Sequence, residues 1–119
     1  MNYFSDKELA CPCCGKLIFD SRFREDLNAA RTFAGIPFHI NSGYRCFKHN
    51  KWIGGLATSS HPKGLATDIR TASSRERYKV LFGLIMAGIT RIGIGKNFIH
   101  ADMDEAKPSE VMWTYYEEE

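Results

Sequence analysis

The sequence lacks any long hydrophobic run. Its most apolar stretch, Leu81 to Ile89, has nine residues, which is about half the length that a helix needs to cross a bilayer. The N-terminus also lacks a basic start followed by an apolar stretch, so we expect no secretory signal. The chain therefore predicts cytoplasmic synthesis and no membrane anchor.

The sequence also lacks an excess of either charge. Sixteen Lys and Arg residues stand against fourteen Asp and Glu residues, which leaves a net charge of +2 at pH 7. Since a nucleic-acid-binding domain typically carries a basic patch, we expect no nucleic-acid partner. Hydrophobic residues make up 44% of the 119 residues and charged residues 25%, as in globular proteins. This length predicts one domain, residues 1–119, with a single core, and we expect a monomer.

Cysteine is scarce and unevenly placed, since three of the four cysteines lie within four residues. The residues are Cys11, Cys13, Cys14 and Cys46. This spacing is unlike a disulfide framework, and residues 11–15 predict a thiol-rich knuckle. We favour reduced thiols, or a disulfide from Cys46 to Cys11 or Cys13, over a second zinc site. The reason is that adjacent Cys13 and Cys14 cannot easily point at one metal.

Hydrophobic periodicity predicts two helices. The first spans residues 20–35 and would bury the stripe Phe23, Leu27, Ala30 and Ala34. The second begins after Ser73 and Ser74 and would bury Tyr78, Leu81, Phe82, Ile85 and Ile89. A third, short helix follows Ser5, which has a glutamate three residues later as in a capping box. Residues 3–15 thus combine this short helix and the knuckle.

Short strands are expected at residues 38–41, 65–71, 90–94, 97–103 and 111–116, and residues 117–119 form an acidic tail. Residues 42–63 are rich in glycine and serine and predict a loop, and a loop of this length in a small domain tends to be functional. Together these elements predict an α+β fold in which helices flank a small, mostly antiparallel sheet.

Two histidines and an aspartate have a spacing that suits a metal. His61 leaves the long loop, Asp68 follows on a predicted strand, and His100 lies on another strand. Two imidazoles and one carboxylate are a standard ligand set for catalytic zinc. Strand alternation places Phe98, His100 and Asp102 on one face. By spacing alone, however, the histidines could equally be surface or core residues and the two acids could be turn or edge residues.

A longer series of residues resembles a known family. Ser42-Gly43-Tyr44-Arg45, His49-Asn50, Gly54-Gly55, Ser59-Ser60-His61, Asp68 and Phe98-Ile99-His100-Ala101-Asp102 occur in this order. The series resembles the small zinc peptidases that include D-Ala-D-Ala carboxypeptidases, L-alanyl-D-glutamate endopeptidases of phage lysis and D,D-dipeptidases, whose fold the Hedgehog N-terminal domain shares. The resemblance covers residues 4–104 and implies Zn²⁺ held by His61, Asp68 and His100.

The resemblance also implies roles for residues around the metal. Arg45 matches the arginine that contacts the substrate and polarises the scissile carbonyl, and Ser59 matches a serine of the substrate-binding lip. A structural role remains open for both. Many members carry a glutamate base three residues before the last histidine, where this chain has Asn97. We therefore predict that Asp102 is the base or an orienting partner, unless it is purely structural.

The function implied is a zinc metallopeptidase, a hydrolase of peptidoglycan stem peptides that acts as L-Ala-D-Glu endopeptidase or D-Ala-D-Ala carboxypeptidase. Because no secretory signal is expected, cell wall degradation would need delivery by a holin or a virion, as for a phage endolysin. The alternative is a catalytically inactive zinc-binding domain of the same fold, with a virion-structural or wall-binding role.

Overall fold

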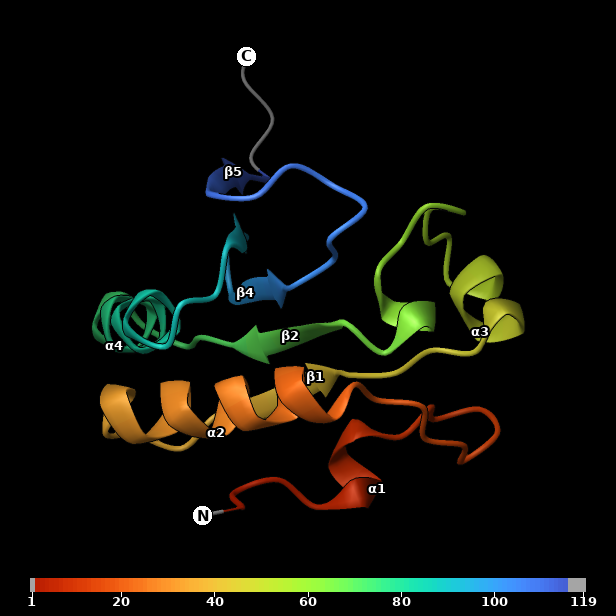
Figure 1. Cartoon of the computed structure of the whole chain (residues 1–119), viewed down its shortest axis with the longest axis horizontal. Helices are drawn as coiled ribbons and strands as arrows, with labels where there is room; N and C mark the ends of the chain where they lie inside the picture. The colour runs from red at the N-terminus through yellow and green to blue at the C-terminus, as the bar shows by residue number, and fades with distance from the viewer. Residues whose placement is uncertain (1, 116–119) are drawn as a thin grey trace.

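The computed structural model describes residues 2–115, so Tyr116 and the acidic tail predicted for residues 117–119 lie outside the described residues. Within these described residues, four α-helices, a short 3₁₀ turn and five strands follow one another (Figure 1). Their order is α1 (Asp6–Leu9), α2 (Ser21–Ala34), β1 (His39–Ser42), α3 (Phe47–Trp52), the 3₁₀ turn (His61–Lys63), β2 (Ala66–Arg70), α4 (Ser74–Met86), β3 (Arg91–Ile94), β4 (Phe98–Asp102) and β5 (Val111–Thr114). None of the helices described is long and apolar enough to cross a membrane.

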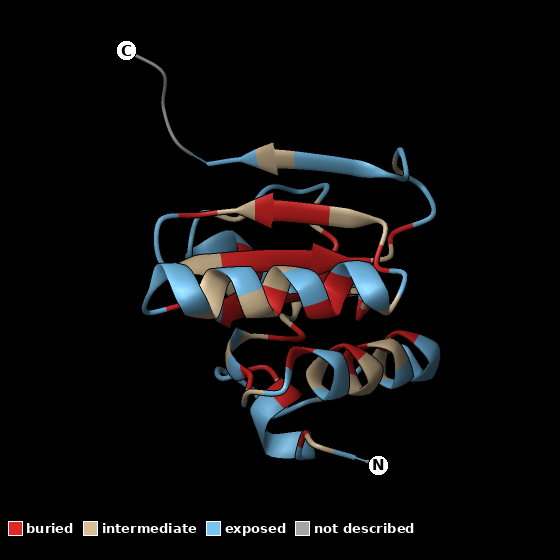
Figure 2. Ribbon diagram, turned by 90° about the vertical axis from the view of Figure 1, so that its left-hand side faces the viewer, coloured by how far each residue is buried: buried red, intermediate tan, exposed pale blue. Residues whose placement is uncertain are grey.

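The five strands form one sheet in the order β1-β2-β4-β3-β5. The first three neighbouring pairs are antiparallel, whereas β5 runs parallel to β3. The prediction of an α+β fold with a mostly antiparallel sheet is therefore confirmed. In Figure 2 the middle strands are largely red, and β5 at the top edge is mostly pale blue, because it has one neighbouring strand.

Helices α2 and α4 pack together, and their buried residues join those of the sheet in a single core. The stripe predicted for α2 is confirmed, since all four of its residues are buried. The capping box at the start of α1, from Ser5 to Glu8, is also present. On the sheet, Ile69, Ile92 and Ile99 point into this core.

The stripe predicted for α4 is largely wrong. The structure buries Val80, Gly83 and Leu84 and exposes Tyr78, Phe82 and Ile85; Leu81 is partly buried and Ile89 is buried. Gly83 explains the error, because a Cβ there would lie 2.3 Å from the carbonyl oxygen of Ala30 on α2. The two helices are in close contact at a residue that has no side chain, and hydrophobic periodicity does not count such a residue.

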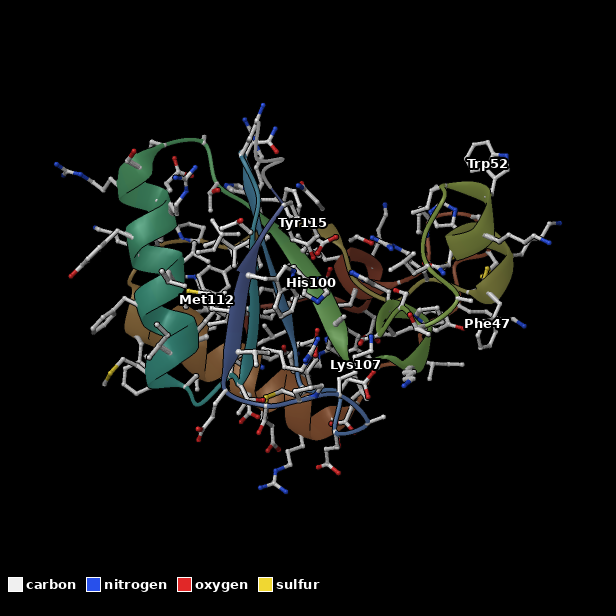
Figure 3. The ribbon with its side chains drawn as sticks, turned by 90° about the horizontal axis from the view of Figure 1, so that it is seen from above. Phe47, Trp52, His100, Lys107, Met112 and Tyr115 are labelled. Carbon is white, nitrogen blue, oxygen red and sulfur yellow. The ribbon has the colours of Figure 1, made fainter. Side chains whose placement is uncertain are left out.

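The loop predicted for residues 42–63 is also only partly correct. It contains helix α3, whose N-cap Cys46 accepts a hydrogen bond from the backbone N–H of His49. The helix has six residues and buries only Asn50 among them, so it offers no apolar stripe to find. Figure 3 shows the side chains of Phe47 and Trp52 pointing outward from it.

Candidate active site

His61 opens the 3₁₀ turn and is almost fully buried. Its Nδ1 lies 2.7 Å from the carbonyl oxygen of Gly43. Since a carbonyl only accepts, Nδ1–H is the donor, and Nε2 is the ring nitrogen that is left to face the other site residues. That Nε2 lies 3.4 Å from Oδ2 of Asp68. Gly43 thereby fixes both the tautomer of His61 and its direction.

Asp68 and His100 are direct partners across the antiparallel strands β2 and β4. Cross-strand partners place their side chains on the same face of a sheet. Oδ1 of Asp68 lies 2.9 Å from Nδ1 of His100, and the rings of His100 and His61 are 5.4 Å apart. One donor atom from each of the three residues lies within 4.8 Å of the other two. The structure therefore brings the three predicted ligands together.

Asp102 lies on the far side of the His100 ring. Its Oδ2 accepts a hydrogen bond from His100 Nε2 at 2.6 Å. Its Oδ1 accepts from Arg91 Nε at 2.8 Å and from the backbone N–H of Asp104 at 3.1 Å. Asp102 is 1% exposed, and both of its oxygens are engaged. The carboxylate therefore holds Nε2–H and turns Nδ1 of His100 toward Asp68.

The charges of this group reinforce one another. Burial by itself would raise the pKa of Asp68, but hydrogen bonds from His100 and His61 outweigh it and hold the pKa below the ordinary value. The pKa of Asp102 is lowered against burial in the same way, by His100. Burial would lower the pKa of His100, yet its bonds to the two carboxylates raise it. The site therefore favours positive charge between its carboxylates.

Arg45 reaches Asp68 from the loop that follows β1. Its Nη2 lies 3.2 Å from Asp68 Oδ2, its Nε donates to Ser42 Oγ and its Nη1 donates to Asn50 Oδ1. The arginine thus bridges a loop to an acid, one of the two roles left open by the sequence. Ser59 Oγ accepts from the backbone N–H of His61 at 3.2 Å, a turn contact.

A family model described as Peptidase M15 matches residues 2–102. The chain belongs to the peptidase M15 family. The match spans most of the described chain and includes the three residues brought together above. No curated protein matches the chain at a significant level.

Peptidases of the M15 family are zinc-dependent, and the donor chemistry of this chain fits that metal. Two imidazoles and a carboxylate form a catalytic zinc set. The outer nitrogen of His61 is held by Gly43 and that of His100 by Asp102. Such outer partners orient metal-binding histidines and fix their tautomers. Nε2 of His61 and Nδ1 of His100 are left to face Asp68.

The three residues line a pocket of about 450 Å³. Arg45 and Ser59 also line it, as do the aromatic residues Trp113 and Tyr115 of the C-terminal segment. Figure 3 shows His100 and Tyr115 above the strands, with α4 on one side and α3 on the other. Asn97, at the position of the family's usual glutamate, is exposed and does not line the pocket.

The sequence analysis did not predict that Trp113 and Tyr115 line the pocket, although it expected a strand at residues 111–116. Parallel pairing places Trp113 beside Gly93 of β3. A Cβ on Gly93 would lie 2.6 Å from Trp113 Nε1, so the glycine makes room for the indole. The indole ring lies 5.7 Å from the ring of His100. The only sequence signal is this glycine between the two isoleucines of the strand.

A third acid, Asp104, fixes the segment before His61, a role that the sequence analysis did not predict. Its Oδ2 accepts from Ser60 Oγ at 2.8 Å and from Lys63 Nζ at 2.9 Å. Although burial opposes it, these bonds lower the pKa of Asp104 to about 2. The carboxylate therefore ties the 3₁₀ turn to the end of β4.

Proposed function

We propose that this chain is a zinc-dependent peptidase that hydrolyses a peptide bond in peptidoglycan stem peptides, as an L-Ala-D-Glu endopeptidase or a D-Ala-D-Ala carboxypeptidase. The observation that carries the proposal is the meeting of the His61, Asp68 and His100 donor atoms inside a pocket. When bound there, Zn²⁺ lowers the pKa of a water and polarises the scissile carbonyl. In the net reaction the peptide C–N bond breaks, water oxygen joins the carbonyl carbon, and the leaving nitrogen gains a proton.

In this proposal Asp102 is a positioning residue rather than the base. Both of its oxygens already accept hydrogen bonds, and it is 1% exposed. It therefore holds a proton at Nε2 of His100 and keeps Nδ1 free for the metal. A carboxylate that fixes a ligand in this way raises the basicity of the imidazole.

The pocket suits a substrate with a carboxylate beside the scissile bond, as stem peptides have. Arg45 and Lys107 line it, and a guanidinium binds a carboxylate with two parallel hydrogen bonds. We propose that Arg45 keeps its bonds to Ser42 and Asn50 and turns the remaining N–H groups to the substrate, with Ser59 beside it. Delivery to the wall by a holin or a virion belongs to the same proposal.

The test incubates purified, zinc-loaded protein with peptidoglycan, with and without a chelator, and measures new amino groups. Mass spectrometry of the released muropeptides identifies the bond by the new terminus. We expect release that the chelator abolishes, and a loss of at least ten-fold in kcat/KM for Arg45→Ala. The matched control is Arg70→Ala, an exposed arginine of β2 outside the pocket, which should keep full activity.

One observation favours the alternative, a zinc-binding domain without hydrolysis. Among the described residues that line the pocket, the carboxylates are Asp68 and Asp102, and both are engaged with histidines. A zinc-loaded protein that binds peptidoglycan and releases no amino groups would establish this alternative and refute the peptidase.

A further inference from the structure

A second group of metal-binding atoms lies away from the pocket. This four-cysteine cluster consists of Cys11, Cys13, Cys14 and Cys46, all of which are free thiols. Their sulfur atoms all lie within 4.8 Å of one another. The argument from sequence that adjacent Cys13 and Cys14 cannot point at one metal is therefore wrong.

The local backbone explains how the adjacent cysteines converge. Residues 12–14 form a turn, closed by a hydrogen bond of 2.8 Å from the Gly15 N–H to the Cys11 carbonyl. A second bond of 2.8 Å, from the Cys11 N–H to the Lys16 carbonyl, closes the segment again. Neighbouring side chains point apart in a strand, but in this turn they gather on one side and meet Cys46.

We propose that the four-cysteine cluster binds a second, structural Zn²⁺. The sulfur of Cys13 lies 3.4 Å from that of Cys46, and the sulfur of Cys11 lies 3.6 Å and 3.7 Å from those of Cys13 and Cys46. Four sulfurs held at about 2.3 Å from one zinc are about 3.8 Å apart, at the corners of a tetrahedron. The cluster is thus close to the geometry of a closed, four-cysteine structural site.

The surroundings of the sulfurs fit thiolates. Backbone N–H groups point at two of them, from Cys46 to Cys11 Sγ at 3.5 Å and from His49 to Cys46 Sγ at 3.4 Å. Four thiolates around Zn²⁺ carry a net charge of −2, and Lys48 and Lys51 line the same surface hollow as three of the cysteines. Positive charge is therefore available beside the excess negative charge.

The position of the cluster gives the second zinc a task. Cys46 follows Arg45 directly, and the N–H of Tyr44 donates to the Leu9 carbonyl at 2.8 Å. The same segment carries the Gly43 carbonyl that orients His61. Zinc in the cluster would clamp the N-terminal segment to the loop that positions Arg45 and His61, a loop otherwise held by few buried apolar side chains.

The test counts metals in the whole protein. Protein purified with reductant and zinc, then analysed by plasma mass spectrometry, should hold two zinc ions per chain and no iron. Cys13→Ser combined with Cys46→Ser should hold one, and so should His61→Ala combined with His100→Ala. Trp52→Ala, which alters the same hollow without removing a sulfur, should keep both.

A second measurement covers the case in which the cysteine variants fail to fold. The variant with both histidines replaced keeps the cluster intact; loaded with Co²⁺, it should show sulfur-to-metal charge-transfer absorption and the visible bands of tetrahedral cobalt. A variant without the two histidines that holds no zinc would overturn the proposal, as would a mass reduced by two hydrogens through a disulfide in the unaltered protein. Neither outcome depends on peptidase activity, so this inference stands or fails separately from the proposed function.

Discussion

Replacing Asp102 with asparagine should weaken zinc binding without removing a ligand. The asparagine oxygen can stay on His100 Nε2–H, but its NH₂ group then faces two other donors, Arg91 Nε–H and the backbone N–H of Asp104. If the amide turns over, its NH₂ faces Nε2, which must then accept and leave the proton on Nδ1, the atom that faces Asp68. Either arrangement opposes the tautomer that binds metal.

The size of the effect follows from the bond that is lost. A hydrogen bond to a charged group contributes about 1.5–3 kcal/mol, which corresponds to a loss of roughly 10- to 100-fold in zinc affinity, the range typical of such outer partners. The zinc dissociation constant is measured by competition with a chromogenic chelator. The control is Ser73→Ala, which removes the N-cap of α4 at an exposed position outside the pocket and should cost about 1 kcal/mol of stability at unchanged zinc affinity. Unchanged zinc affinity in Asp102→Asn would show that Asp102 does not position His100.

The remaining predictions concern stability. Because the folded pKa of Asp104 is about 2, below its ordinary 3.8, its stabilisation is complete above pH 4 and is lost as the pH falls through 2. Asp104→Asn should therefore reduce the free energy of unfolding by roughly 1–2 kcal/mol at pH 6, measured by urea titration, and a deficit that persists at pH 2 would contradict the assignment. Gly83→Ala should gain about 1 kcal/mol in helix propensity and lose more through the clash with the Ala30 carbonyl, roughly 1–3 kcal/mol; a higher melting temperature would refute the close packing.

The features that could be predicted from the sequence are those that depend on a regular local pattern of residues. The stripe of α2 and the shared face of His100 and Asp102 follow from simple periods of 3.6 and 2 residues, and the structure shows both. The proximity of His61 to Asp68 was predicted from the ordered motifs of the family, because a gap of seven residues does not by itself imply a contact. The roles assigned to these residues stay predictions until zinc and turnover are measured.

What the sequence did not disclose depends on contacts between distant segments. The close contact of the helices at Gly83 and the space for Trp113 beside Gly93 both depend on glycine, which has no side chain. Glycine therefore adds nothing to a hydrophobic pattern in the sequence. The bonds from Asp104 to Ser60 and Lys63 cross more than forty residues. The convergence of Cys13 and Cys14 depends on a tight turn, and the extended chain assumed for adjacent cysteines gave the wrong geometry.

The hydrogen bonds that build the site also determine when it can form. They join residues 18, 32 and 44 positions apart in the sequence, and closing such loops costs chain entropy before any contact is gained. The zinc-binding geometry therefore requires β2 and β4 to be paired, because Asp68 and His100 are cross-strand partners. Zinc that binds only this assembled geometry stabilises the native state alone, so the rate of metal release would report how often the sheet opens.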